Sequence, residues 1–190
     1  MAEIVLIRHG QTEWSANGRH TSYTDLPLTE EGERQAGVVG KRIAGRQFAA
    51  VLSSPRRRAL HTAELAGLSV TEVVDDLAEW HYGDYEGVTT REIRRTRPGW
   101  SLWTDGCPNG ESPEQAGARL DRVLARAREL LTGGDVALVA HGHCLRVAGA
   151  RWIGLPPAAG GLLKLDTATL SVLGFEHGDD PVLTTWNAPG

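Results

Sequence analysis

Short apolar runs alternate with longer segments of mixed polarity along most of the chain. The runs predict strands at residues 3–7, 49–53, 70–74, 135–140, 170–175 and 182–186. Helices are predicted between them, from residue 29 to about 46, from Pro55 onward, at 89–97, from Ser112 to about 131 and after His143. Apolar strands that alternate with helices are typical of a mainly parallel sheet with helices on both faces. We therefore predict an α/β fold in three layers, in which the last two strands are antiparallel.

Helix-start signals support two of these helices. Thr29 is followed by two glutamates, and Ser112 opens the capping box SPEQ with proline at the first helical position. The helix behind Ser112 places one set of apolar side chains on a single face: Leu120, Val123, Leu124, Ala127, Leu130 and Leu131. Residues 11–28 predict an extended loop, and residues 77–87 predict a second loop that is rich in aromatic and acidic residues.

The composition is that of an ordinary globular protein. The 190 residues include 20 basic and 24 acidic side chains and are 41% hydrophobic, which excludes a disordered or collagen-like chain and favours one domain over residues 1–190. The mild acidity argues against a nucleic-acid partner. No run approaches the roughly 20 apolar residues of a membrane span, and the N-terminus lacks signal-peptide features, so we expect a cytoplasmic protein without a membrane partner. Cys107 and Cys144 are too few for a disulfide framework.

Two of the predicted strands end in the same dipeptide. His9-Gly10 follows the first strand and His141-Gly142 follows the fourth, while the second strand leads into the arginine run 56–58. In open α/β sheets, ligands bind beyond the carboxyl ends of the strands. If these three strands are neighbours, Arg8, both histidines and one arginine of the run meet at one edge of the sheet. Their positive charges repel one another unless an anion is bound, and phosphate is the expected anion.

Simpler interpretations of the same residues remain open. Eighteen arginines against two lysines are explained by a GC-rich genome, and a histidine after a strand is commonly a loop or capping residue. Consecutive helical residues point about 100° apart, so at most two of the three arginines at 56–58 can face one site. Metal binding by His9, His141 and His143 is disfavoured because Arg8 would repel a cation, and we expect no metal and no other cofactor.

A series of motifs resembles the histidine phosphatase superfamily, also called phosphoglycerate-mutase-like. The motifs occur in the family's order, and they are LIRHGQT at 6–12, LTEEG at 28–32, SSPRRRALHTA at 53–63, LAEWHYGDYEG at 77–87, GES at 110–112 and AHG at 140–142. RHG alone is a weak signal, whereas the ordered series is specific. Within the superfamily, the chain is most similar to broad-specificity acid phosphatases of actinobacteria.

The resemblance implies a metal-independent phosphomonoesterase with inorganic phosphate as a product. By this resemblance, His9 is the nucleophile that forms a phosphohistidine. Glu79 is the proton donor, and His141 contacts the oxygens of the phosphoryl group that is transferred. Arg8 and Arg58 bind the phosphate, which leaves the other two arginines of the run largely solvated.

Further residues follow from positions at which relatives contact phosphate or substrate. Ser15 and Thr21 are candidate phosphate ligands, although many relatives carry Asn in place of Ser15 and the serine side chain has a shorter reach. The candidate substrate-pocket residues are Ser22, Trp80, Tyr82, Trp103 and His143. The aromatic residues, with Trp100, fit a hydrophobic core equally well. We expect Cys107 and Cys144 to be structural rather than catalytic.

Three other functions remain as alternatives. A cofactor-dependent phosphoglycerate mutase is disfavoured because the segment between Glu79 and His141 lacks the longer insert of the mutases. A non-catalytic phosphate-sensing or partner-binding domain would not need both a nucleophile and an acid. A phosphatase of phosphohistidine proteins is a further alternative, although such relatives are shorter. The resemblance also makes a homodimer an option, without locating an interface.

Overall fold

The computed structural model describes residues 1–189 and contains a six-stranded sheet in the order β3-β2-β4-β1-β5-β6. The strands are β1 Ile4–Arg8, β2 Phe48–Ser53, β3 Glu72–Val73, β4 Asp135–Ala140, β5 Thr169–Glu176 and β6 Asp180–Pro189. The first four strands run parallel, β5 pairs antiparallel with β1, and β6 pairs antiparallel with β5. The predicted mainly parallel sheet is therefore confirmed.

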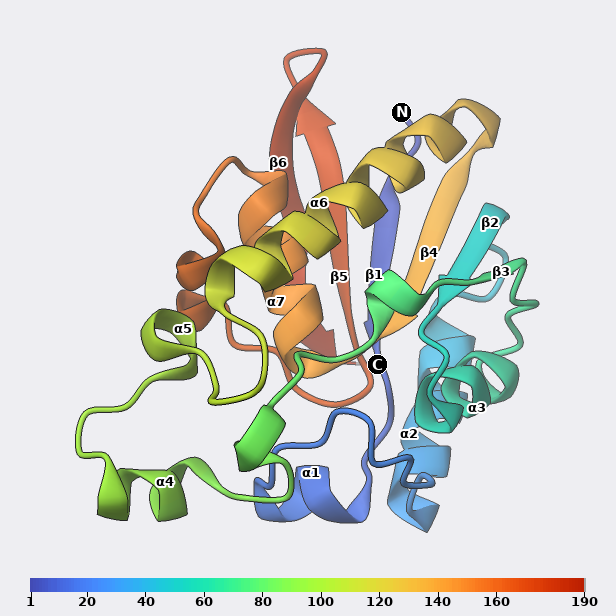
Figure 1. The fold of residues 1–190 in the computed structure, drawn as a ribbon. Coiled ribbons are helices and arrows are strands. Elements are labelled where there is room, and N and C mark those ends of the chain that lie inside the picture. Colours follow the sequence, from blue (N-terminus) through green and yellow to red (C-terminus); the bar gives the residue numbers. More distant parts are fainter. Residues whose placement is uncertain (190) are drawn as a thin grey trace.

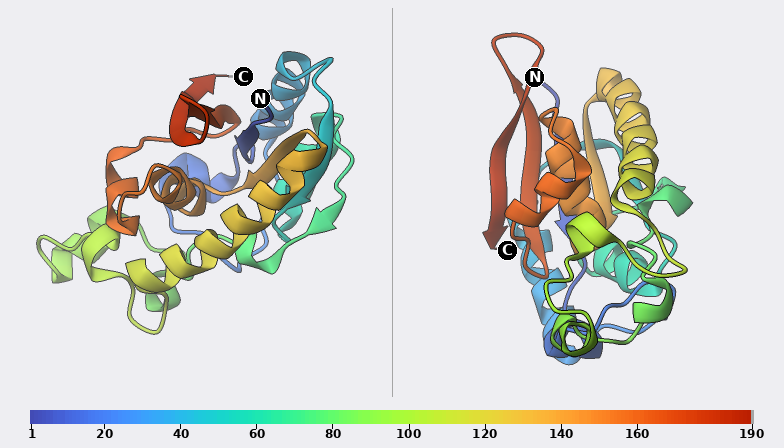
Figure 2. Two further views of the ribbon diagram at one scale, coloured as in Figure 1. Left: turned by 90° about the horizontal axis from the view of Figure 1, so that it is seen from above. Right: turned by 60° about the vertical axis from the view of Figure 1, so that its left-hand side comes forward.

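Helices cover both faces of this sheet, as predicted (Figures 1 and 2). The helices are α1 Glu13–Asn17, α2 Glu30–Arg42, α3 Arg57–Leu65, α4 Thr90–Thr96, α5 Leu102–Asp105, α6 Pro113–Leu130 and α7 Gly142–Trp152. Short 3₁₀ segments lie at Asp75–Leu77, Gly83–Tyr85, Leu131–Gly133 and Pro157–Leu162. In Figure 1, α6 and α7 lie in front of the sheet, and α1 and α4 lie beyond its lower end.

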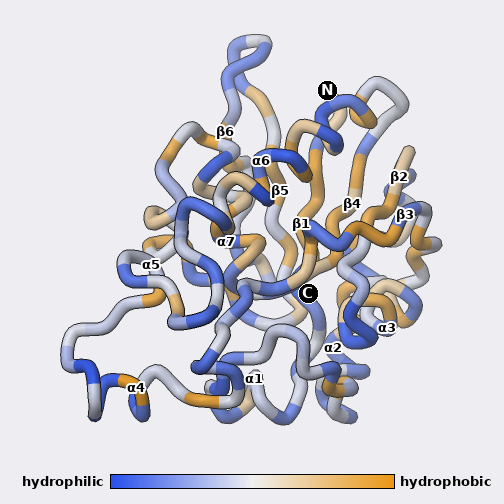
Figure 3. The backbone as a smooth tube through the Cα atoms, in the orientation of Figure 1, coloured by the Kyte–Doolittle hydropathy of each residue, from blue (hydrophilic) through white to orange (hydrophobic). Residues whose placement is uncertain are grey.

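Alternate residues of the central strands enter two separate cores, because successive strand side chains point to opposite faces. Ile4 and Leu6 of β1 pack in the core that α6 and α7 cover. Val5 and Ile7 pack in the core that α2 and α3 cover. The continuous hydrophobic colour of β1, β2 and β4 in Figure 3 reflects this burial on both faces.

The strand register brings the two His-Gly dipeptides together. Arg8 pairs with Ala140 across the β1–β4 ladder, and the backbone N–H of His9 donates to the Ala140 carbonyl at 3.0 Å. On the other side of β4, the backbone N–H of Ser54 donates to the Val139 carbonyl at 3.0 Å. The ends of β1, β4 and β2 therefore meet at one edge of the sheet, as the sequence predicted.

Two glycines allow the loop after β1 to pack against the first turn of α2. A Cβ on Gly10 would lie 2.3 Å from the Gly32 carbonyl oxygen, and a Cβ on Gly32 would lie 2.1 Å from the Gln11 carbonyl oxygen. Neither backbone can move aside without distorting the segment that carries His9. This close backbone contact explains the glycines of the RHG and LTEEG motifs.

The predicted loop at 11–28 is wrong for the five residues of α1. Thr12 caps this helix, and the Ser15 hydroxyl accepts from the Thr12 backbone N–H at 2.8 Å, which completes a capping box. The signal was missed because serine occupies the position where Glu or Gln marks such a box, and because the helix buries no residue. The structure also ends the first long helix at Arg42 rather than near 46, shortens the third strand to two residues, and adds α5.

Candidate active site

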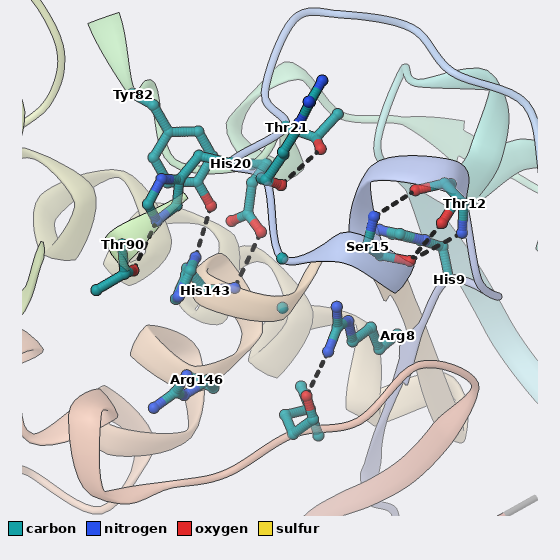
Figure 4. A pocket seen from close by; sticks show the side chains of 15 residues that line it. Arg8, His9, Thr12, Ser15, His20, Thr21, Tyr82, Thr90, His143 and Arg146 are labelled. Atoms are coloured by element: carbon teal, nitrogen blue, oxygen red, sulfur yellow. Dashed lines mark hydrogen bonds between the residues drawn. The ribbon is translucent and has the colours of Figure 1, made fainter. Parts of the chain in front are cut away.

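A cavity of about 190 Å³ lies at the carboxyl ends of β1 and β4 (Figure 4). The residues that line it are Arg8, His9, Thr12, Ser15, Gly18, Arg19, His20, Thr21, Glu79, Tyr82, Thr90, Gly142, His143, Arg146 and Leu165. Three of them are arginines, and Glu79 is the one acid among them. The cavity is therefore suited to an anionic ligand.

His9 lines the cavity, and one of its two ring nitrogens, Nδ1, is hydrogen-bonded to the backbone. Its Nδ1 lies 2.7 Å from the Gly10 carbonyl oxygen, and because a carbonyl can only accept, Nδ1 carries the proton. Burial, followed by the charges of Arg58 and Arg8, holds the pKa of His9 well below its ordinary value. The imidazole is therefore neutral near pH 7, with its lone pair on Nε2.

His141 and Arg58 lie next to His9 but do not line the cavity itself. The His9 and His141 rings meet edge to face with their centroids 5.1 Å apart. Arg58 Nε donates to His141 Nδ1 at 3.1 Å, so His141 Nε2 carries the proton and donates to the Ser54 hydroxyl at 2.7 Å. Burial, then Arg58, holds the pKa of His141 well below its ordinary value.

The Arg58 guanidinium is buried and has no carboxylate partner in the part of the chain that the structure describes. Besides the bond to His141, it donates to the carbonyl oxygens of Thr24 at 3.0 Å, Thr21 at 3.2 Å and Ser22 at 3.1 Å. A guanidinium has five N–H donors, so one remains for a ligand. Arg58 thus ties the loop after α1 to the floor of the site.

Arg8 keeps more of its donors free. Its Nη1 donates to the Leu165 carbonyl, while its buried Nε has no hydrogen-bond partner among the described residues. A Cβ on Gly142 would lie 3.2 Å from the Arg8 Cζ and Nε atoms, so the glycine lets the guanidinium rest against the first turn of α7. A buried, unpaired N–H group of this kind is stabilised when an anion accepts a hydrogen bond from it.

Glu79 reaches the same turn of α7 from the loop at 77–87. Its Oε1 accepts from the backbone N–H groups of Trp80 and Cys144, each at 2.8 Å, and its Oε2 accepts from that of His143 at 3.0 Å. A carboxylate offers about four lone-pair positions, so one position on Oε2 remains open. The carboxyl group is therefore rigidly held, with one acceptor position free toward the cavity.

The rings of Tyr82, His143 and His20 line another side of the cavity. The Tyr82 hydroxyl is hydrogen-bonded to His143 Nδ1. Burial raises the pKa of Tyr82 well above its ordinary value and holds the pKa of His143 well below its own. Tyr82 is therefore the donor, and His143 is neutral with its proton on Nε2. His20 packs on the Tyr82 ring with centroids 4.7 Å apart.

Three of the sequence-predicted pocket residues lie away from the cavity. Trp80 is fully buried in the core, where its Nε1 donates to the Glu111 carbonyl at 3.1 Å. Trp103 stacks edge to face with Trp80 and His143 behind the cavity wall. Ser22 is buried, and it is the carbonyl of Ser22 that binds Arg58.

Ser15 and Thr21 line the cavity, but their hydroxyl groups have local partners. Ser15 Oγ donates to the Thr12 carbonyl at 3.0 Å within the capping box of α1. Thr21 Oγ1 donates to the Arg19 carbonyl at 3.1 Å. Either hydroxyl must exchange this bond before it can donate to a ligand.

Several residues that line the cavity were not predicted from the sequence, and they are Thr12, Gly18, Arg19, His20, Thr90, Gly142, Arg146 and Leu165. Arg146 had a usable signal, because it lies four residues after Gly142 and so falls on the same face of α7. His20 and Thr90 had none, since two loops bring them together.

Residues 1–189 contain neither a candidate cation site nor a helix that could span a membrane. No group of three or more His, Cys, Asp or Glu side chains within this range is placed to hold a metal ion. No helix within it is both long and apolar enough to cross a membrane.

Comparisons with known proteins agree on one family. The model of the histidine phosphatase superfamily, branch 1, matches residues 4–189. An acid phosphatase of Mycobacterium tuberculosis is 47% identical over 177 residues, which cover 92% of this chain and 87% of that protein. A sedoheptulose 1,7-bisphosphatase of Saccharomyces cerevisiae is 40% identical over 182 residues, which cover 80% of this chain and 67% of that protein. The solved structure of an open reading frame product of M. tuberculosis superposes with a TM-score of 0.96 at 44% identity and covers 99% of this chain and 98% of that one.

Proposed function

The chain belongs to the histidine phosphatase superfamily and is a phosphoric monoester hydrolase, and we propose that it works without a metal through a phosphohistidine on His9. The whole of residues 1–190 forms the catalytic domain in this proposal. The observation that carries it is the tautomer of His9. The bond from Nδ1 to the Gly10 carbonyl leaves the Nε2 lone pair free beside Arg8 and Arg58, neither of which has a carboxylate partner among residues 1–189.

In the first step, Nε2 of His9 attacks the phosphorus of the ester in line with the leaving oxygen. A P–N bond forms as the P–O bond to the substrate breaks. The lowered pKa of His9, caused by burial and by Arg58 and Arg8, supports this role because it keeps the lone pair available at and below neutral pH.

Positive charge around the phosphoryl group supplies most of the catalysis in such a transfer. Arg8 contributes its unpaired Nε and its free Nη2, and Arg58 contributes its one remaining N–H. His141 lies edge to face with His9 and exchanges its Ser54 partner for a phosphoryl oxygen. The two arginines are held in place before the substrate arrives, and only His141 has to exchange a hydrogen bond.

Glu79 moves the proton in both steps. Its open position on Oε2 carries the proton that neutralises the leaving alkoxide, and the resulting carboxylate then takes a proton from the water that attacks phosphohistidine. The second step breaks the P–N bond, releases inorganic phosphate and restores neutral His9. The three backbone donors hold the carboxyl group in place throughout.

An assay with p-nitrophenyl phosphate in excess EDTA tests this proposal. The wild type is expected to release nitrophenol undiminished by the chelator, and His9→Ala is expected to lose at least about a thousandfold in kcat. His61→Ala is a matched control, since His61 lies on α3 outside the residues that line the cavity.

Either of two results would overturn the proposal. Activity that EDTA abolishes would point to a metal enzyme, and equal activity in His9→Ala would remove His9 from the mechanism. Transfer of the phosphoryl group to a second hydroxyl of a phosphoglycerate, rather than to water, would favour the mutase alternative.

A further inference from the structure

The Arg146 side chain of α7 is held by Gly160, Gly161 and Trp103, which together form a socket, and the proposed mechanism gives this arginine no role. Its Nε donates to the Gly160 carbonyl at 2.9 Å and its Nη2 to the Gly161 carbonyl at 3.0 Å. Its guanidinium also stacks over the Trp103 ring, 4.4 Å from the ring centroid. Nη1 has no hydrogen-bond partner among the described residues, so this nitrogen is available to a ligand.

The socket depends on a glycine pair in the segment Pro157–Leu162. A Cβ on Gly160 would lie 2.7 Å from the Trp103 ring, and a Cβ on Gly161 would lie 3.0 Å from it. The two glycines thus allow Trp103 to lie flat against this segment and to support Arg146. A long side chain that is stacked and doubly hydrogen-bonded loses little further freedom when it binds a ligand.

No carboxylate neutralises Arg146 within residues 1–189. The comparably buried Arg119 forms an ion pair with Glu111, and Arg151, on the same helix as Arg146, pairs with Asp121. Glu79 is the one acid that lines the cavity, and three backbone N–H groups and the charge of Arg8 already act on it. Burial is the largest cause of the lowered pKa of Arg146; the charge of Glu79 opposes it in part, and the repulsion of Arg8 adds to it.

Arg146 lies apart from the groups that would bind the reacting phosphate. In Figure 4, His9 and Ser15 lie on one side of the cavity, Arg146 lies beside His143 on the other, and Arg8 lies between them. Arg19, which also lines the cavity, is exposed and has no ion-pair partner among the described residues. The cavity therefore carries positive charge at two places, and one phosphoryl group compensates only the charge near His9.

We infer that Arg146, assisted by Arg19, forms a second anion subsite, so that the preferred substrates are small phosphate monoesters that carry a second anionic group. That group is a carboxylate or another phosphate, since both match the planar donors of a guanidinium. The cavity of about 190 Å³ restricts the substrate to a short carbon chain between the two groups. This inference rests on the proposed function and adds the substrate class.

Matched substrates test the inference. Glycerol 3-phosphate has one anionic group, 3-phosphoglycerate adds a carboxylate to a similar skeleton, and glycerol 1,3-bisphosphate adds a phosphate. We expect wild-type kcat/KM to be higher for one or both of the doubly anionic substrates than for glycerol 3-phosphate. Comparison of the two identifies which anion the subsite takes.

The variant Arg146→Gln is expected to reduce this preference by about tenfold to a hundredfold, mainly through KM, because a charge-assisted hydrogen bond is lost. The ratio of two kcat/KM values from one preparation does not depend on the folded fraction, so partial misfolding does not obscure the result. Arg146→Lys should recover part of the preference, and Arg151→Gln, on the same helix, should leave it unchanged.

The outcomes separate the two claims. Turnover of all three substrates with equal kcat/KM, or a preference that survives in Arg146→Gln, would overturn the second subsite and leave the phosphatase proposal standing. Failure to hydrolyse any of these esters or p-nitrophenyl phosphate would overturn the proposed function, and the subsite with it.

Discussion

Arg58 donates its Nε–H to Nδ1 of His141 at 3.1 Å, and this bond fixes the tautomer of a buried histidine beside His9. Because an arginine cannot accept a hydrogen bond, the proton of neutral His141 lies on Nε2. Protonation of His141 would break the bond and place two positive charges side by side. In the proposed mechanism Arg58 therefore both binds the phosphoryl group and keeps His141 neutral.

Removal of the Arg58 charge is expected to raise the pKa of His141. Burial is the larger cause of the lowered pKa and Arg58 the next, so in Arg58→Met the pKa should move upward without reaching its ordinary value. A titration of the ring signals by NMR measures the shift. Arg57→Met serves as the control because Arg57 is an exposed neighbour on the same helix, and an unchanged His141 in Arg58→Met would contradict the assigned bond.

The role of Glu79 predicts an effect that depends on the leaving group. In Glu79→Gln the alkoxide of glycerol 3-phosphate must leave unprotonated, and kcat should fall by roughly a hundredfold to ten-thousandfold. The loss with p-nitrophenyl phosphate should be much smaller, because nitrophenolate leaves without a proton. Equal losses for both substrates would show that Glu79 acts by charge or position rather than by proton transfer.

Three buried histidines predict a loss of stability in mild acid. Burial is the largest cause that holds the pKa values of His9, His141 and His143 well below 6.5. Below pH 6.5 the unfolded chain binds protons at these residues that the folded chain does not, so the free energy of unfolding decreases as the pH falls. Between pH 7.5 and 5.5 the three together should cost roughly 3–4 kcal/mol.

Urea unfolding at a series of pH values measures this effect. His143→Phe removes one of the three groups, so its stability should fall less steeply over the same range, by roughly 1 kcal/mol. A wild-type free energy of unfolding that does not change from pH 7.5 to 5.5 would contradict this prediction. It would mean that these histidines bind protons in the folded protein as readily as in the unfolded chain.

Two glycines of α2 predict opposite effects of the same substitution. Gly32→Ala places a Cβ 2.1 Å from the Gln11 carbonyl oxygen, which should destabilise the protein by about 3 kcal/mol and displace the loop that carries His9. A Cβ on Gly37 meets no atom within 4 Å, so Gly37→Ala should stabilise the helix by about 0.5–1 kcal/mol. Thermal unfolding and activity of the two variants measure the contrast; similar effects of both would refute the packing argument.

The sequence predicted that His9 and His141 lie close together, because the carboxyl ends of parallel strands lie at the same edge of a sheet. The pairing of β1 with β4 confirms that the two strand ends are adjacent. The choice of Arg58 from the run 56–58 came from the family motif, since helix geometry alone allows at most two of the three arginines to face one site and does not say which. The capping role of Ser15 was missed because α1 has no buried face and a variant capping box.

The walls of the cavity were less predictable. Residues 77–87 form an irregular loop without a side-chain period, so nothing in the sequence showed that Trp80 enters the core while Tyr82 lines the cavity. His20 and Thr90 come together through contacts between two loops. Such placements depend on tertiary packing, and the local pattern does not specify them.

Detection of the covalent intermediate tests the central claim most directly. Enzyme is mixed with substrate, quenched in base within one turnover, digested and examined by mass spectrometry. We predict a phosphoryl group on the peptide that contains His9, stable in base, lost in acid and absent from His9→Ala. Steady-state hydrolysis by the wild type with no phosphorylated His9, or with the label on another residue, would contradict the mechanism.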